Sequence, residues 1–204
     1  MEKVKLISFP EEPFTDEGDY ENYSIVNRNF SGLILHNLRF ENVSFKGTDF
    51  SQTKIIDIKL RNVRFEDCDL ANLKLEKASL EKVEFVNCRM TGMRVVEGEI
   101  KTALYKNSQL KLAQFRMSRL KNITFENCPL EETDFYGAEM VSVMFKECDL
   151  MKTEMSATKL NNVDFRSSKL AGLNISIASL HGAIIDPTQV NDLAWLLGAK
   201  IEWR

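Results

Sequence analysis

Hydrophobic residues recur at every fifth position of the chain from Ile25 to Ile185 without a break. All 33 positions of this series hold Leu, Phe, Ile, Met, Val or Tyr, and 11 of the 13 phenylalanines lie on it. An unbroken period of this length indicates an internal repeat. Because five residues advance a helix by about 500°, the series would not form one stripe along a helix. The pattern therefore predicts a stack of short extended segments.

Two further positions of each five-residue unit are restricted. We call the hydrophobic fifth residue the centre. The position two before the centre carries no charged residue from Leu33 to Ala183, and this alternation is typical of a short strand. The position two after the centre is rich in Asn and Gly, such as Asn62 and Gly137, which tolerate positive φ in tight turns. Each unit is thus predicted to be a short extended side followed by a corner.

A second period of twenty residues shows how the units close into turns. The members of one aromatic series at this interval are Phe45, Phe65, Phe85, Tyr105, Phe125, Phe145 and Phe165. Like residues that stack every twenty positions indicate four units per turn, with successive turns about 4.8 Å apart. We therefore expect an all-β, four-sided helix of about eight coils, roughly 40 Å long. Its two ends would be exposed strand edges that need covers.

The predicted organisation has three parts. Residues 1–24 are acidic and are expected to form an irregular or short-strand N-terminal cap, and residues 25–185 form the repeat. Residues 186–204 begin with Asp186 and Pro187, which suit the N-cap and first position of a helix. The apolar residues that follow are spaced at i, i+3, i+4 and i+7, as on one face of a helix. They are Val190, Leu193, Ala194 and Leu197. Gly198 is a stop signal, and Ala199–Trp203 alternates as a short strand does.

The repeat resembles a known family. A small residue, a polar residue, Leu or Phe, and two polar residues recur in phase, as in the segment ATKLNNVDFRSSKLAGL at 157–173. This pattern is similar to that of the pentapeptide-repeat proteins and covers about four-fifths of the chain. The resemblance implies a right-handed quadrilateral β-helix with the centres packed along its axis.

The tail carries a second resemblance. The segment DPTQVNDLAWLLGAKIEW at 186–203 is similar to the C-terminal helix of the quinolone-resistance (Qnr-type) branch of that family, in which the tail joins two subunits end to end. The resemblance implies a homodimer, and the alternative is a monomer that the tail caps. The residues expected at the dimer interface are Val190, Leu193, Trp195, Leu196, Leu197, Ile201 and Trp203.

Composition and motifs argue against catalysis. The two histidines, His36 and His181, are far apart in the sequence, and we find no phosphate-binding loop, metal-ligand motif or nucleophile motif. Four cysteines lie two residues before a centre and are expected to be small buried thiols. The expectation is a protein that is not an enzyme and has no cofactor or metal. With a net charge of −3, neither nucleic acid nor membranes are expected partners. The start does not resemble a signal peptide, which favours the cytoplasm.

Charge is distributed unevenly along the repeat. Residues 39–121 hold 17 basic and 11 acidic side chains, whereas residues 122–164 hold 3 basic and 9 acidic ones. In an end-to-end dimer these acids would form a belt beside the join. The residues expected on this acidic partner-binding face are Glu131, Glu132, Asp134, Glu139, Asp149 and Glu154.

The Qnr resemblance implies that such a belt mimics DNA and occupies DNA gyrase or topoisomerase IV, which would protect these bacterial enzymes from fluoroquinolones. Two features depart from that branch: no loop interrupts the repeat, and residues 25–185 carry 23 basic against 20 acidic side chains. The alternative is a structural or scaffolding module with an unknown protein partner. A set of outward apolar residues at 40-residue intervals, Leu104, Met144 and Ile184, would suit such a module.

Overall fold

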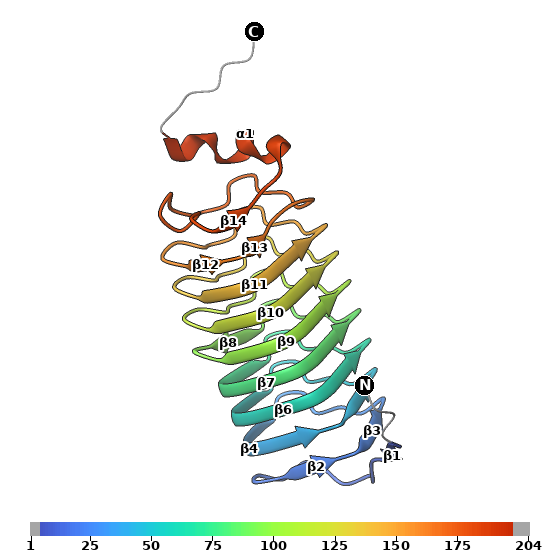
Figure 1. The fold of residues 1–204 in the computed structure, drawn as a ribbon. Coiled ribbons are helices and arrows are strands. Elements are labelled where there is room, and N and C mark those ends of the chain that lie inside the picture. The colour runs from blue at the N-terminus through green and yellow to red at the C-terminus, as the bar shows by residue number, and fades with distance from the viewer. Residues whose placement is uncertain (1–4, 198–204) are drawn as a thin grey trace.

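A computed structural model describes residues 5–197 of the chain. Within them the backbone winds into a right-handed parallel β-solenoid of about nine turns, followed by one short helical segment (Figure 1). Strands pair with a shift of twenty residues, as in Leu80↔Ile100 and Leu120↔Met140. The predicted four units per turn are therefore confirmed.

Fourteen strands form one sheet within the described residues. The strands are β1 (Ile7–Ser8), β2 (Asp19–Glu21), β3 (Tyr23–Val26), β4 (Ile34–Glu41), β5 (Ser44–Lys46), β6 (Lys54–Glu66), β7 (Lys74–Val86), β8 (Arg94–Val96), β9 (Glu99–Lys106), β10 (Arg119–Glu126), β11 (Glu139–Lys146), β12 (Lys159–Asn161), β13 (Val163–Asp164) and β14 (Ala183–Ile184). The expected eight coils are one too few, because β2 and β3 already pair in the twenty-residue register, with Tyr20 beside Phe40.

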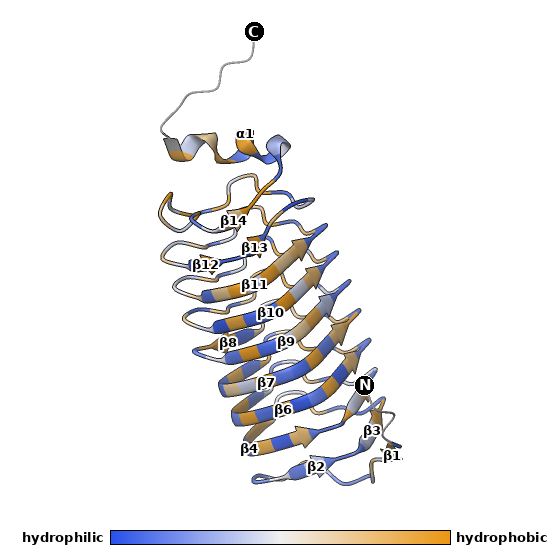
Figure 2. Ribbon diagram, viewed as in Figure 1, coloured by the Kyte–Doolittle hydropathy of each residue, from blue (hydrophilic) through white to orange (hydrophobic). Residues whose placement is uncertain are grey.

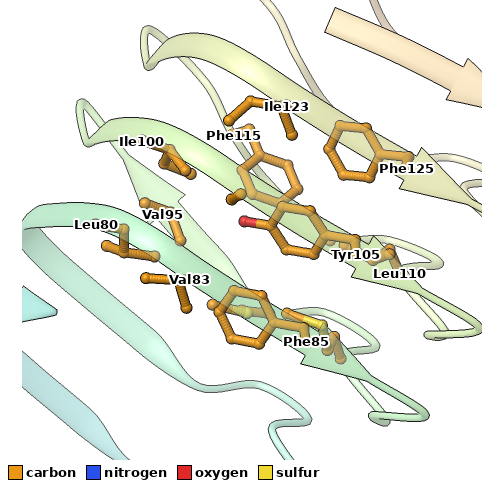
Figure 3. Packing of buried hydrophobic residues seen from close by; sticks show 14 of the residues in the cluster. Leu80, Val83, Phe85, Val95, Ile100, Tyr105, Leu110, Phe115, Ile123 and Phe125 are labelled. Atoms are coloured by element: carbon orange, nitrogen blue, oxygen red, sulfur yellow. The ribbon is translucent and has the colours of Figure 1, made fainter. Parts of the chain in front are cut away.

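The centres fill the interior of the solenoid. Along the aromatic series the rings stack nearly parallel, with centroids 4.8 Å apart between Phe85 and Tyr105 and 4.7 Å apart between Tyr105 and Phe125. Figure 3 shows the Tyr105 ring between these two neighbours. The position two before the centre is buried as well, including all four cysteines, which are free thiols. Hydroxyl groups there donate to the chain below, as Thr133 Oγ1 does to the carbonyl of Leu110 at 2.9 Å.

The corners follow the predicted position through most of the rod. Every fifth residue from Glu17 to Gly172 has φ between +50° and +70°, and the series ends at Ile177, which has no positive φ. Asn and Gly adopt this conformation readily, but Leu112 and Thr102 adopt it here too. Some corners are held by ladders of side-chain amides, and Asn62 Nδ2, for example, donates to the amide oxygen of the Asn one coil below at 2.6 Å.

The two ends of the solenoid are covered differently. At the N-terminus, β1 pairs with β3 in an irregular register, and the buried ring of Phe14 stacks on that of Phe30 with centroids 4.1 Å apart. At the C-terminus, the repeat in the sequence outlasts the repeat in the structure. Leu180 is only half-buried, and Ile185 is 36% exposed. The last coil departs from the register because the N–H of Leu180 bonds to the carbonyl of Ser176 in a local turn.

The C-terminal helical segment begins where the sequence predicts. It consists of a 3-10 turn at Pro187–Gln189, α1 at Val190–Leu193 and a second 3-10 turn at Ala194–Leu197. The carboxylate of Asp186 accepts from the N–H of Thr188 at 2.9 Å as the N-cap. The expected stop at Gly198 and strand at Ala199–Trp203 lie outside the described residues. None of the helices in residues 5–197 is long and apolar enough to cross a bilayer.

Candidate functional site

The outward side chains lie on either side of each centre. Figure 2 shows this as alternating hydrophilic and hydrophobic positions along β6 and β7. Because of the twenty-residue register, equivalent outward residues of successive coils lie in columns along the rod. A column is therefore the unit of the surface, and a binding site on this protein is made of adjacent columns.

The six predicted acidic residues surround the rod instead of sharing one column. Only Asp134 and Glu154 are directly paired with each other, by a parallel β-bridge. Glu139 belongs to another column and pairs with residues of β10 and β12. Asp149 belongs to a third, next to Pro129 and Lys169. Glu131 and Glu132 follow the centre of the side that contains Asp149. The acids therefore form a belt, as the charge count suggested, and not a single face.

Most of these carboxylates contact a base of the same chain. The ion pairs are Arg116–Asp134 at 2.8 Å, Lys159–Glu139 at 2.8 Å, Lys169–Asp149 at 3.3 Å and Lys111–Glu132 at 3.9 Å. Glu154 instead accepts a hydrogen bond from the N–H of Ser156 at 2.6 Å. One carboxylate oxygen of Glu131 is buried without a hydrogen-bond partner among the described residues. The belt is acidic in sum, and four of its six carboxylates are paired with a base.

Two carboxylates of residues 122–164 are held in the charged form by a neighbouring base. The hydrogen bond from Lys159, with the nearby positive charge, lowers the pKa of Glu139. In the same way Arg166 lowers the pKa of Asp164, mainly through its hydrogen bonds. These shifts are toward the charged carboxylate, which is the state that a partner with basic side chains would bind.

A basic hollow lies further along the column of Asp134 and was not foreseen. It has a volume of about 550 Å³ and is lined chiefly by Lys54, Lys74, Arg94, Lys77 and the acids between them. The register places Lys54 beside Lys74 and Lys74 beside Arg94. The signal was present in the sequence as three bases at twenty-residue intervals. It could be found only by reading single outward columns instead of summing charge over long segments.

The tail divides its predicted interface residues between two roles. Leu193 is buried against the last coil, and Leu196 packs there too. Val190 and Trp195 remain exposed, at 53% and 47%. Leu197 is the last described residue of the helical segment, and Ile201 and Trp203 lie outside the described residues. The tail thus covers the rod end with one side and presents a small apolar surface on the other.

Gln189 is a structural residue of the tail that sequence reasoning missed. It is buried, and its side-chain amide donates to the carbonyls of Phe165 and Ser168, each at 2.7 Å. These carbonyls belong to the last coils, and no further coil covers them within the described residues 5–197. Gln189 therefore satisfies part of the strand edge at the end of the rod.

The apolar column proposed for a scaffold is interrupted. Leu104, Met144 and Ile184 do share one column, but Thr124 and Asp164 lie between them. Met144 is 43% exposed and Ile184 36%. The column is therefore a series of separate apolar side chains and not a continuous strip.

Within residues 5–197 no group of three or more His, Cys, Asp or Glu side chains could hold a metal ion. The four cysteine thiols are buried and are therefore kept away from solvent. The contact with Cys68, together with burial, raises the pKa of the Cys88 thiol, and the corresponding contact with Cys128 raises that of Cys148. A protonated buried thiol is a poor nucleophile.

This chain is similar to several known proteins. Among solved structures, a trypsin-treated variant of QnrB1, a plasmid-mediated fluoroquinolone resistance protein, is similar at 22% identity, with a TM-score of 0.44, over 91% of this chain and 100% of that one. HetL, a pentapeptide repeat protein involved in heterocyst differentiation regulation from Nostoc sp. strain PCC 7120, is similar at 15% identity, with a TM-score of 0.33, over 83% and 90% of the two chains.

A comparison with curated proteins finds no match. Sequence models of one family match most of the repeat. The model described as "Pentapeptide repeat region" matches residues 58–135 and 118–195, and the one described as "Pentapeptide repeats (8 copies)" matches residues 29–62. Together with the twenty-residue register and the corner at every fifth residue, these matches show that the chain belongs to the pentapeptide-repeat family.

Proposed function

We propose that this protein is a non-catalytic binding protein whose partner is DNA gyrase or topoisomerase IV, and that it protects these enzymes from fluoroquinolones by mimicking DNA. The main support for this proposal is the acidic charge of the coils next to the tail. The coils next to the tail, residues 122–164, bear 9 acidic and 3 basic side chains. The choice of DNA gyrase or topoisomerase IV as the partner rests on the resemblance of the tail to the Qnr branch.

The charge density of these coils is close to that of DNA. Residues 122–164 span about two coils, or roughly 10 Å of the rod axis at about 4.8 Å per coil. Their net charge is −6, from 9 acids and 3 bases. This is about one negative charge per 1.7 Å, and duplex DNA carries one per about 1.7 Å of its axis. A basic channel that accepts DNA would therefore attract this part of the rod.

The tail would double the length of the acidic belt. We propose that Val190 and Trp195, the exposed apolar residues of the helical segment, meet those of a second copy. The belts of the two copies would then lie on either side of the join. Trp195→Glu would place a charge in this apolar contact, and the expected result is a shift from dimer to monomer in sedimentation velocity. A wild-type protein that is monomeric at tens of micromolar would contradict the end-to-end dimer.

The direct test is gyrase supercoiling with and without ciprofloxacin, titrated with the purified protein. We expect rescue of supercoiling that is lost when Glu132, Asp134 and Glu154 are all replaced by Lys. The matched control replaces three acids outside the belt, Asp57, Glu81 and Glu97, by Lys, which changes the net charge equally. If only the belt variant fails, the acids act at their positions and not through net charge.

Two results would contradict the proposal. Rescue that survives the belt variant would mean that binding does not use these carboxylates. An absence of any effect at micromolar concentrations would favour the alternative, a scaffolding module with another protein partner. In that case Met144→Asp, which alters an exposed apolar residue, is the first variant to examine in pull-down experiments.

A further inference from the structure

We propose that one side of the rod binds a second copy of the same chain side by side and antiparallel. The side is defined by the column Lys54, Lys74, Arg94, Gln114, Asp134, Glu154 and Asn174. This contact is distinct from the end-to-end contact of the tail, and it goes beyond the proposed function.

The backbone register places these residues in one uninterrupted series. The strand pairs Lys54↔Lys74 and Lys74↔Arg94 continue as the bridges Arg94↔Gln114, Gln114↔Asp134, Asp134↔Glu154 and Glu154↔Asn174. Three basic residues are therefore followed by one neutral residue, two acidic residues and another neutral one. Gln114 marks the change of sign, with opposite charges at equal distances on its two sides.

A column of this kind is complementary to itself when reversed. A two-fold axis through Gln114, in the plane of the contact and perpendicular to the rod, sets the column against its own reverse. Arg94 then faces Asp134 of the second copy, about 4.8 Å from the axis, and Lys74 faces Glu154, about 10 Å from it. Each of these pairs occurs twice, so the contact has four ion pairs.

The neighbouring column is compatible with the same pairing. Val96 would face Tyr136 of the second copy, which joins an aliphatic and an aromatic side chain. Arg116 lies at the level of the axis and would approach its own copy. Each Arg116 is bound to Asp134 at 2.8 Å and lies over the Tyr136 ring at 4.8 Å. The two like charges at the axis are therefore flanked by two carboxylates.

The basic half of the column is the part that most needs a partner. Lys54 has an ion pair with Glu76 at 2.9 Å, whereas Lys74 and Arg94 have none with another described residue. Stacking in register holds these like charges near one another, which is unfavourable without a counter-charge. The hollow of about 550 Å³ at this point of the surface gives room for the carboxylate side chains of a second copy.

The size of the side predicts a weak contact. Seven residues of a column span about 30 Å, and one side is about 13 Å wide, so a pair of rods would bury well under about 1,200 Å² in total. Contacts of this size are transient, and this one would depend on charge. We therefore expect association that high salt abolishes.

Side-by-side pairing would also regulate the proposed function, because it covers Asp134 and Glu154, two acids of the belt. A copy that is paired in this way could not present them to another protein. The test below uses the protein alone, so its failure would leave the gyrase experiment unaffected, and the reverse also holds.

Gln114→Cys tests the axis directly. It places two thiols together across the predicted two-fold axis, while the native cysteines are buried. The matched control is Thr124→Cys, on a different column of the same part of the rod and similarly half-buried. Under mild oxidation we expect disulfide-linked dimers of Gln114→Cys, about tenfold fewer of Thr124→Cys, and loss of the difference in 1 M NaCl, where the Debye length is about 3 Å. Equal cross-linking of the two variants, or none of Gln114→Cys, would overturn the proposal.

Charge exchange tests the register. In the Gln114→Cys background, K74E/R94E makes the four charged positions nearest the axis acidic, and D134K/E154K makes them basic. Each variant alone should cross-link about tenfold less, because like charges then oppose one another. An equimolar mixture should restore cross-linking, now as hetero-dimers distinguishable by mass. Restoration also shows that both variants are folded. Undiminished cross-linking of either variant alone, or no hetero-dimer in the mixture, would refute the antiparallel contact.

Discussion

Tyr105 interrupts a column of phenylalanines with a hydroxyl group. Its side chain is fully buried between Phe85 and Phe125, and its Oη atom has no hydrogen-bond partner among the described residues. Burial raises the pKa of Tyr105, so the hydroxyl stays protonated. A buried polar group without a partner costs about 1–3 kcal/mol of desolvation. Tyr105→Phe would remove that cost and keep the stacked ring.

The expected result is a more stable protein, by about 1–3 kcal/mol. For a chain of this length each kcal/mol raises Tm by roughly 2–4 °C. Thermal and urea unfolding, followed by circular dichroism at the strand band, would measure the change. The reciprocal control is Phe125→Tyr, which adds a hydroxyl one coil away in the same column and should destabilise by a similar amount.

The two variants together test whether the Tyr105 hydroxyl is buried without a hydrogen-bond partner. A Tyr105→Phe protein that is less stable than wild type would mean that the hydroxyl has a partner in solution. A Phe125→Tyr protein as stable as wild type would mean that the interior accepts hydroxyl groups without cost. Either result would refute the reasoning from burial.

Three other variants test the core, the rod end and the ion pairs. Leu110→Ala, at a fully buried centre, should lower the free energy of unfolding by about 2–5 kcal/mol, and a loss below about 1 kcal/mol in urea unfolding would contradict its packing between fixed coils. Gln189→Ala leaves two carbonyls of the last coils unpaired and should cost about 1–3 kcal/mol, whereas an unchanged Tm would show that the tail does not cover this edge. Hydrogen bonding to Lys46 lowers the pKa of Glu66 from its ordinary 4.5, so the stabilisation is present above that pH and is lost as the pH falls through the lowered pKa. Glu66→Gln should therefore flatten the decline of stability between about pH 5 and pH 3, and an unchanged pH profile would argue against the ion pair.

The interior and the corners were predictable because they are set by local rules that repeat. A centre must be apolar, and the residue two positions on must accept positive φ. The corner at Leu112 shows the limit of reasoning from residue type. Leu rarely adopts this conformation, and only the phase of its neighbours predicts it. At Ile185 the five-residue period predicts a buried side chain that is in fact exposed. In the part of the chain that the structure describes, no coil beyond Ile185 covers it.

The candidate surfaces were less predictable. Summed charge indicated an acidic segment but could not tell that Asp134 and Glu154 share a column while Glu139 lies on another. It also hid the basic series at Lys74 and Arg94, since acids on other columns cancel it. The double role of the tail depends on which side of a short helix meets the rod, and helical spacing alone does not determine that.

The twenty-residue register makes the length of this protein a discrete quantity. A duplication or deletion of one complete coil would change the rod by about 4.8 Å and leave every remaining column on its original side. An insertion of five residues inside the repeat would keep all centres buried yet turn everything beyond it by a quarter of a circle. Evolution can therefore alter the spacing between the tail and a surface patch, or the angle between them, independently and in fixed steps. A family built in this way could adapt to partners of different sizes without redesigning its interior.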